Sequence, residues 1–118
     1  MEIWVEFQNK EWRISPDPAK VKLGTPVSWR FRATGLGVRR VKWTVVFHKS
    51  PFKHSPKANP GGPFVVSTET IPNENGQHIG TSPTTIADTP GDYKYDVRAE
   101  NGENAEPLGN EDPYLSVA

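Results

Sequence analysis

The sequence contains no cysteine, and this absence removes several kinds of chemistry at once. A chain without thiols forms no disulfide bonds, gives no thiolate ligand to a metal ion, and has no cysteine nucleophile. The absence does not identify a compartment, because a protein without disulfides can still be secreted. Disulfide-dependent folds and thiolate chemistry are therefore both excluded.

The chain also lacks any long apolar run. No stretch approaches the ~20 apolar residues that a membrane-spanning helix requires. The first ten residues, MEIWVEFQNK, begin with an acidic residue and alternate as a strand does, whereas a secretory signal peptide begins with a basic region. We therefore expect no membrane span and slightly favour a cytoplasmic protein, with a mature secreted form as the alternative.

Helical periodicity is missing as well. Apolar and polar residues alternate with a period of two almost everywhere, as strands require. In residues 26–33, PVSWRFRA, the side chains of Val27, Trp29 and Phe31 share one face. The same alternation marks residues 2–7, 41–48 and 92–99. One apolar and one polar face per strand is typical of antiparallel sheet, so we expect Trp29 and Trp43 in the core.

Weaker segments complete the predicted fold. Four further stretches fit strands less well: Ala19–Leu23, Phe64–Thr70, His78–Ala87 and Tyr114–Val117. The prolines and glycines fall mostly between the strands, as turn residues do. A chain of 118 residues is long enough for one domain with its own core. We predict a single all-β domain over 1–118, a two-sheet antiparallel Greek-key sandwich of seven to eight strands, with a long loop at 48–63.

Three segments resemble the cupredoxin family. Residues 14–31, ISPDPAKVKLGTPVSWRF, are similar to the opening of such domains, with a glycine-led turn at Gly24–Pro26 between two core strands. Residues 89–97, TPGDYKYDV, are similar to the closing hairpin, and residues 112–117, DPYLSV, to the last strand. Immunoglobulin-like modules also end in PGxYxYxV, which makes an immunoglobulin-like sandwich the close alternative. The resemblance implies a cupredoxin-like fold.

The same resemblance implies that the copper ligands are missing. Cupredoxins bind copper with two imidazoles and a thiolate, and the motif G-x-Y-x-Y-x-C delivers the cysteine. Val97 stands at the cysteine position, and Arg40 and Lys42 stand where the first histidine is expected. The loop that follows, 99–113, has no histidine, and the one methionine is Met1. We predict the scaffold without blue-copper electron transfer.

Other metal chemistry and catalysis have little support in the sequence. The three histidines are His48, His54 and His78, and a metal site would need all three, or two and a carboxylate, to converge. Neither G-x-S-x-G nor H-E-x-x-H occurs, and no glycine-rich phosphate loop precedes a helix. We expect solvated histidines, no metal, no cofactor and no enzymatic activity.

Charge is distributed unevenly along the chain although the net charge is zero. Residues 19–68 contain ten basic and no acidic side chains, and residues 69–118 contain ten acidic and two basic ones. The favoured interpretation is pairing across neighbouring strands, for instance Arg30 and Arg32 opposite Asp96 and Glu100. The other interpretation is a basic interaction surface. Zero net charge makes nucleic acid an unlikely partner.

The sequence thus suggests two kinds of binding. The main hypothesis is a non-catalytic, metal-free accessory or structural subunit that binds a protein or a second copy of itself. Its interaction surface would consist of Arg30, Arg32, Arg39, Arg40, Lys49, Phe52 and Lys53, unless the ring of Phe52 folds back onto the rim of the sandwich. The alternative is a small-ligand module, carbohydrate first, in which aromatic rings stack on the ligand. The candidates for stacking are Trp4, Phe52 and Tyr114, whereas Trp12 is expected to cap the core.

Overall fold

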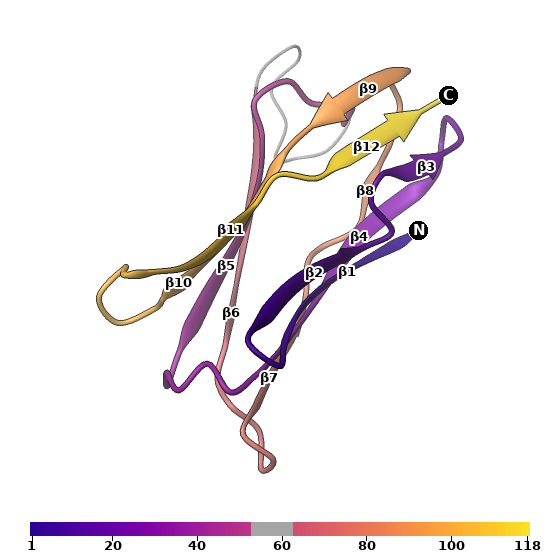
Figure 1. The fold of residues 1–118 in the computed structure, drawn as a ribbon. Helices are drawn as coiled ribbons and strands as arrows, with labels where there is room; N and C mark the ends of the chain where they lie inside the picture. Colours follow the sequence, from indigo (N-terminus) through magenta and orange to yellow (C-terminus); the bar gives the residue numbers. More distant parts are fainter. Residues whose placement is uncertain (53–62) are drawn as a thin grey trace.

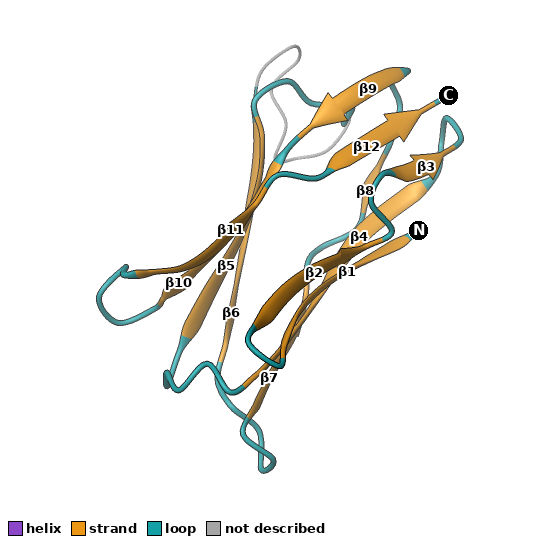
Figure 2. Ribbon diagram, viewed as in Figure 1, coloured by secondary structure: helices purple, strands orange, loops and turns teal. Residues whose placement is uncertain are grey.

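The fold is known from a computed structural model, which describes residues 1–52 and 63–118. Twelve strands and no helix occur in this part of the chain (Figures 1 and 2). The strands are β1 (Glu2–Gln8), β2 (Glu11–Ser15), β3 (Ala19–Val21), β4 (Pro26–Thr34), β5 (Val41–Phe47), β6 (Phe64–Thr70), β7 (Gln77–Thr81), β8 (Thr85–Ile86), β9 (Gly91–Lys94), β10 (Asp96–Asn101), β11 (Pro107–Glu111) and β12 (Tyr114–Val117). Within the described residues, no helix is long and apolar enough to cross a membrane.

The strands form three hydrogen-bonded groups arranged as two layers. One sheet has the order β2-β1-β4-β7, with β8 also paired to β4, and a second has the order β11-β10-β5-β6. A third group, β3-β12-β9, continues the second layer, because β9 leads directly into β10 and β11 leads into β12 (Figure 1). The predicted all-β sandwich is confirmed.

Two details differ from the prediction. The strand count is higher, and two of the pairings are parallel: β1 with β4, and β3 with β12. Alternation in the sequence specifies which face of a strand is buried, but it is the same for a parallel and an antiparallel neighbour. The direction of pairing depends instead on how the chain crosses between the layers.

Aromatic residues fill the space between the layers. Trp29 and Trp43 are fully buried, as predicted, and Phe31 stacks on Trp43 with ring centroids 5.0 Å apart. The ring of Tyr95 stacks on Phe47 at 4.5 Å, and its hydroxyl accepts a hydrogen bond from the indole of Trp29 (3.2 Å). The two sheets are therefore joined by large side chains that satisfy their own polar atoms.

Some strands were missed or merged at the sequence level. Strand β2 holds Trp12, which lies half-buried against Phe7 and Trp43 and so caps the core as expected. The predicted strand at 78–87 is two strands, β7 and β8, because Ser82 and Pro83 interrupt it. The Ser82 hydroxyl there accepts the backbone N–H of Trp29 (2.8 Å).

Candidate functional site

Trp4 and two arginines form a stack on the outer face of the first sheet. In the parallel pairing of β1 with β4, Trp4 lies opposite Arg30, and Arg32 follows two residues later on the same face. The guanidinium carbon of Arg32 lies 4.9 Å from the centre of the Trp4 ring, and that of Arg30 lies 5.7 Å away. Both distances are those of cation–π contacts, which hold the guanidinium groups against the indole.

Acidic residues of the first strand flank this stack. Arg30 forms an ion pair with Glu2 (3.1 Å), and both side chains are about half exposed. Glu6 lies between Arg32 on one side and Arg13 of β2 on the other, as the strand register shows. The local charge is therefore balanced by residues of β1, which lie far from the acidic end of the sequence.

Exposed isoleucines extend the same face. Ile79 of β7 lies opposite Arg32 in the register and is 56% exposed. Ile71, which is 69% exposed, precedes Pro72, whose backbone bridges to His78 next to Ile79. We define the Trp4 face as Glu2, Trp4, Glu6, Arg13, Arg30, Arg32 and Ile79.

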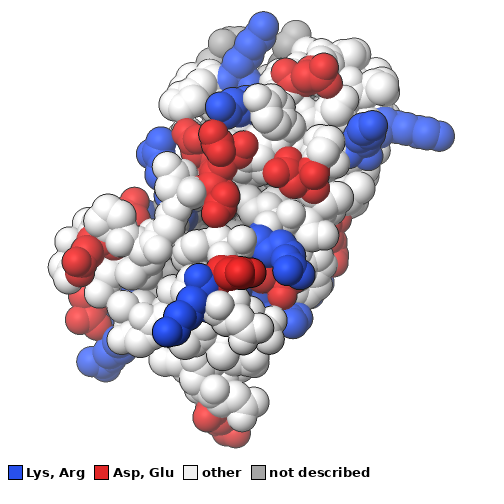
Figure 3. Space-filling view, in the orientation of Figure 1, with Lys and Arg blue, Asp and Glu red and all other residues white. Residues whose placement is uncertain are grey.

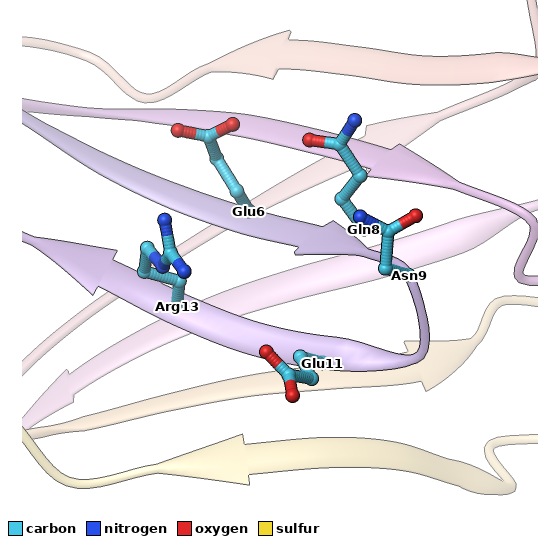
Figure 4. A pocket seen from close by; sticks show the side chains of 5 residues that line it. All are labelled: Glu6, Gln8, Asn9, Glu11 and Arg13. Atoms are coloured by element: carbon cyan, nitrogen blue, oxygen red, sulfur yellow. The ribbon is translucent and has the colours of Figure 1, made fainter.

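A polar hollow at the β1–β2 hairpin shares Glu6 and Arg13 with the Trp4 face. Figure 4 shows Glu6 and Gln8 of β1, Asn9 of the turn, and Glu11 and Arg13 of β2 around it. All five lining side chains are polar or charged, whereas sites for small ligands are mainly apolar with a few polar groups. The hollow therefore resembles the polar, solvated rim of a protein–protein interface more than a small-ligand site.

The predicted pairing of Arg30 and Arg32 with Asp96 and Glu100 is wrong. The arginines lie on β4, which pairs with β1, β7 and β8, whereas the acids lie on β10 in the other layer. Residues on different layers cannot be cross-strand neighbours. The error followed from the assumption that basic and acidic segments of the sequence must meet.

Pairing between the basic and acidic segments does occur on the second layer. Lys42 of β5 lies between Glu69 of β6 and Glu100 of β10 in the two registers. Within the acidic segment itself, Lys94 forms an ion pair with Asp112 (3.1 Å). Figure 3 shows acidic and basic side chains interspersed over the visible surface. On this face of the molecule, basic and acidic side chains that are separate in the sequence are thus mixed.

The other basic candidates do not join the Trp4 face. Arg39 and Arg40 are exposed just before β5, and Lys49 is exposed just after it. The seven residues of β5 separate the two arginines from Lys49 by about 20 Å at the usual rise per residue of a strand. Lys53 lies outside the described residues. Among the described residues of the predicted basic surface, the structure therefore brings Arg30 and Arg32 together on the Trp4 face.

The assignment of Phe52 to a binding surface is also wrong. Its side chain is fully buried, and its ring packs against Phe47 (5.0 Å), Phe64 (4.9 Å) and Trp29 (6.2 Å). The turn before it folds back, because the Ser50 hydroxyl accepts the Phe52 backbone N–H (2.9 Å). Burial of a large apolar ring stabilises the fold and leaves nothing for a partner to contact.

Tyr114 is the remaining stacking candidate. It is 48% exposed at the start of β12, on the three-stranded group, and its backbone N–H donates to Asp17 (3.1 Å). Trp4 lies on a different hydrogen-bonded group, the five-stranded sheet. The three predicted stacking aromatics therefore do not form one platform: one is buried, one is covered by arginines and one lies on another strand group.

The described histidines do not converge. His48 is exposed after β5, 3.4 Å from Asp96, whereas His78 is buried in β7 beside Thr70, which pairs with the opposite end of β5. His54 lies outside the described residues. Among the described residues, no group of three histidine, aspartate or glutamate side chains is placed to hold a metal ion.

Buried His78 has a structural role that the sequence did not suggest. Its Nε2 donates to the Val38 carbonyl (2.9 Å), and its Nδ1 forms a hydrogen bond with Thr70, whose hydroxyl lies 3.0 Å away and whose carbonyl lies 3.2 Å away. The same hydroxyl accepts the indole N–H of Trp43 (2.9 Å). This chain of hydrogen bonds fixes the loop before β5 to the two sheets.

The positions that hold copper in the cupredoxin resemblance do not fit a metal. Val97 is buried in β10, between Val45 of β5 and Glu111 of β11. Arg40 is exposed, and its side chain lies over Gly102. A hydrocarbon and a cation offer no donor for copper. No step of any mechanism can therefore be assigned to copper at these positions.

Comparison with known proteins supports the fold and nothing finer. No protein-family model and no curated protein matches the chain. Among solved structures, it is similar to auracyanin A, a blue copper protein from the green thermophilic photosynthetic bacterium Chloroflexus aurantiacus. The identity is 20%, the TM-score is 0.50, and the match covers 100% of this chain and 98% of auracyanin A.

A second solved structure has a similar outline. Rusticyanin from Thiobacillus ferrooxidans matches with 15% identity and a TM-score of 0.49, over 100% of this chain and 77% of rusticyanin. The conclusion about the fold rests on auracyanin A. The chain is a cupredoxin-like β-sandwich in which the copper-ligand positions carry no metal-binding side chains.

Proposed function

We propose that this domain is a non-catalytic, metal-free protein-binding module that docks a partner on the Trp4 face. The observation that carries the proposal is the stack of Arg32 on Trp4 beside exposed Ile79. Tryptophan and arginine are the residues most enriched among energetically dominant contacts of protein interfaces. An apolar side chain next to them supplies area for burial.

The guanidinium group of Arg32 is preorganised for contact with a protein partner. It forms no ion pair with any residue that the structure describes, so the stack leaves its N–H groups available. A guanidinium held by an aromatic ring loses less conformational freedom on binding than a free one. We therefore expect the partner to place a carboxylate at Arg32.

Carbohydrate binding has less support. Sugars stack on an open aromatic face, but two guanidinium groups lie over the Trp4 ring and Phe52 is buried. Tyr114 alone remains exposed among the three candidates. One ring is a smaller platform than the sequence suggested, so we favour a protein partner.

The test compares partners captured from host extract by the wild-type protein and by the variant Arg32→Glu. The matched control is Lys20→Glu, an equal change of charge at an exposed residue of β3, on another strand group. We expect quantitative mass spectrometry to find a protein that wild type and Lys20→Glu retain and Arg32→Glu loses about tenfold, which corresponds to ~1.4 kcal/mol.

Thermal unfolding of all three proteins shows whether they are equally folded. Ile79→Lys provides a second variant on the same face and should lose the same protein. If wild type, Arg32→Glu and Ile79→Lys capture the same proteins in equal amounts, the Trp4 face is not the docking site and the proposal is wrong.

A further inference from the structure

Among the described residues, strand β6 is an edge strand of the second sheet. It is the last strand in the order β11-β10-β5-β6, and all seven of its residues pair with β5 without a register shift. An edge strand presents one row of N–H and C=O groups without a neighbouring strand. Strand β6 is thus a long and regular strand whose backbone N–H and C=O groups on one side pair with no other described strand.

Only one end of this edge is close to another strand. Thr68 and Thr70 lie near Gly80 of β7, since a Cβ added to that glycine would be 3.2 Å from Thr68 and 2.7 Å from Thr70. The other end, Phe64–Ser67, has no second strand beside it among the described residues. We call this stretch, residues 64–67, the β6 edge.

The β6 edge lacks the features that normally prevent strands from pairing with other molecules. Native edges carry prolines, lysines, bulges or inward-pointing charges. Strand β2 has Glu11 and Arg13, and β11 has Pro107 and lies next to a register shift in β10. Within β6, FVVSTET, there is no proline, lysine, arginine or bulge, and Glu69 lies outside the β6 edge.

We propose that the β6 edge binds the same edge of a second copy of this chain, antiparallel, so that the two four-stranded sheets become one. A two-fold axis at Val66 would place Val65 opposite Ser67 of the second copy and keep the two Glu69 side chains apart. Val65 is 46% exposed on this strand, and β-branched residues such as valine favour strand pairing. Identical strands related by a two-fold axis form a closed, self-complementary interface.

Charge does not oppose this contact. The formal net charge of the chain is zero, so two copies do not repel each other over long range. The inference goes beyond the proposed function, because the β6 edge belongs to the second sheet and the Trp4 face to the first. One chain could therefore hold a second copy at one surface and another protein at the other.

The experiment measures the mass of the full chain by sedimentation equilibrium over a wide range of protein concentration. Wild type is expected to change from monomer to dimer as concentration rises. Val65→Lys should weaken the dimer at least tenfold, and Val65→Lys with Ser67→Lys should abolish it, because four lysines would meet across the axis. Both sites are exposed, so the variants are expected to fold.

Ile79→Lys is the matched control, because it adds a lysine to the edge strand of the other sheet. It should dimerise as wild type does. Hydrogen exchange gives a second readout: backbone amides of residues 64–67 should be protected more at high concentration than at low.

Two results would overturn the inference. The first is a wild-type mass of one chain at every concentration. The second is a dimer that survives both lysines on β6. If that dimer is lost in Ile79→Lys or Arg32→Glu, self-association uses the Trp4 face instead. Loss of a captured protein in Arg32→Glu with an unchanged dimer would support the two proposals separately.

Discussion

At the scale of single residues, the chain uses aromatic side chains in two distinct ways. In the core, Trp29 and Tyr95 satisfy each other's polar atoms through one hydrogen bond while their rings pack edge to face. On the surface, Trp4 instead holds the guanidinium groups of Arg30 and Arg32. The same residue type therefore serves stability in one place and, in our proposal, recognition in another.

Tyr95 makes stability depend on alkaline pH. Its burial raises the pKa of the phenol well above the ordinary value, with a smaller opposite effect from the Trp29 hydrogen bond. Above about pH 10 the unfolded chain loses this proton while the folded chain keeps it, so the free energy of unfolding falls as pH rises. We expect a contribution of about 1.4 kcal/mol per pH unit from this one group.

Urea titrations of wild type and Tyr95→Phe between neutral pH and pH 11 measure this effect. The variant should be less stable at neutral pH by about 1–3 kcal/mol, because the Trp29 N–H loses its acceptor. Its stability should then decline less steeply than that of wild type in the alkaline range. Parallel pH profiles for the two proteins would show that Tyr95 does not titrate in this way.

At the scale of elements, contact between β2 and β11 closes one side of the sandwich. Trp12 of β2 lies directly over Gly109 of β11, where a Cβ would overlap the indole. On the opposite side, Thr68 and Thr70 of β6 approach Gly80 of β7. Both closures rely on a glycine that lets a side chain of the other sheet come close.

Replacement of Gly109 by alanine should displace the Trp12 ring. The displacement would separate it from Phe7 and Trp43, at a cost of about 1–3 kcal/mol in the free energy of unfolding. Urea unfolding measures the loss, and near-ultraviolet circular dichroism reports the altered indole. In a Trp12→Ala background, the same Gly109→Ala change should cost much less.

Gly102→Ala is the matched control for this variant. A Cβ there would meet the side chain of Arg40, which is exposed and can swing into solvent. We expect a smaller effect on stability than at Gly109. Equal losses for Gly109→Ala in the presence and absence of the Trp12 indole would contradict the proposed overlap.

At the scale of the whole molecule, the fold resembles that of a blue copper protein, but the positions expected for its ligands carry Val97, Arg40 and Lys42. Strand β10 places Val97 between β5 and β11, where it packs as a core residue. The position at which cupredoxins carry the cysteine ligand is therefore part of the hydrophobic core in this chain. This is the physical basis for the metal-free part of our proposal.

Metal analysis of protein purified without chelators from copper-supplemented cells tests that part. We expect less than stoichiometric copper and no change in melting temperature when copper or zinc is added. A metal bound only to the folded state, at a concentration one hundred times its Kd, would stabilise it by about 2.7 kcal/mol. Stoichiometric copper with such a stabilisation would contradict a metal-free domain.

Sequence alone predicted much of the fold because alternation of apolar and polar residues is a local property. It identified β1, β4, β5 and the inward faces of Trp29 and Trp43, and the missing cysteine already excluded a thiolate ligand. Strand β11, PLGNE, was missed because its residues do not alternate, and strand β2, EWRIS, was missed because it alternates over only five residues beside a turn.

Only the tertiary structure decided which of these residues meet. The parallel pairing of β1 with β4 places Trp4 beside Arg30 and Arg32, whereas the sequence suggested acids of β10 as their neighbours. The fold of the turn after β5 buries Phe52, for which the sequence allowed both an exposed anchor and a ring folded back onto the sandwich. Burial and alternation follow from each residue and its near neighbours in the chain, but contacts between distant strands depend on the path of the chain between layers.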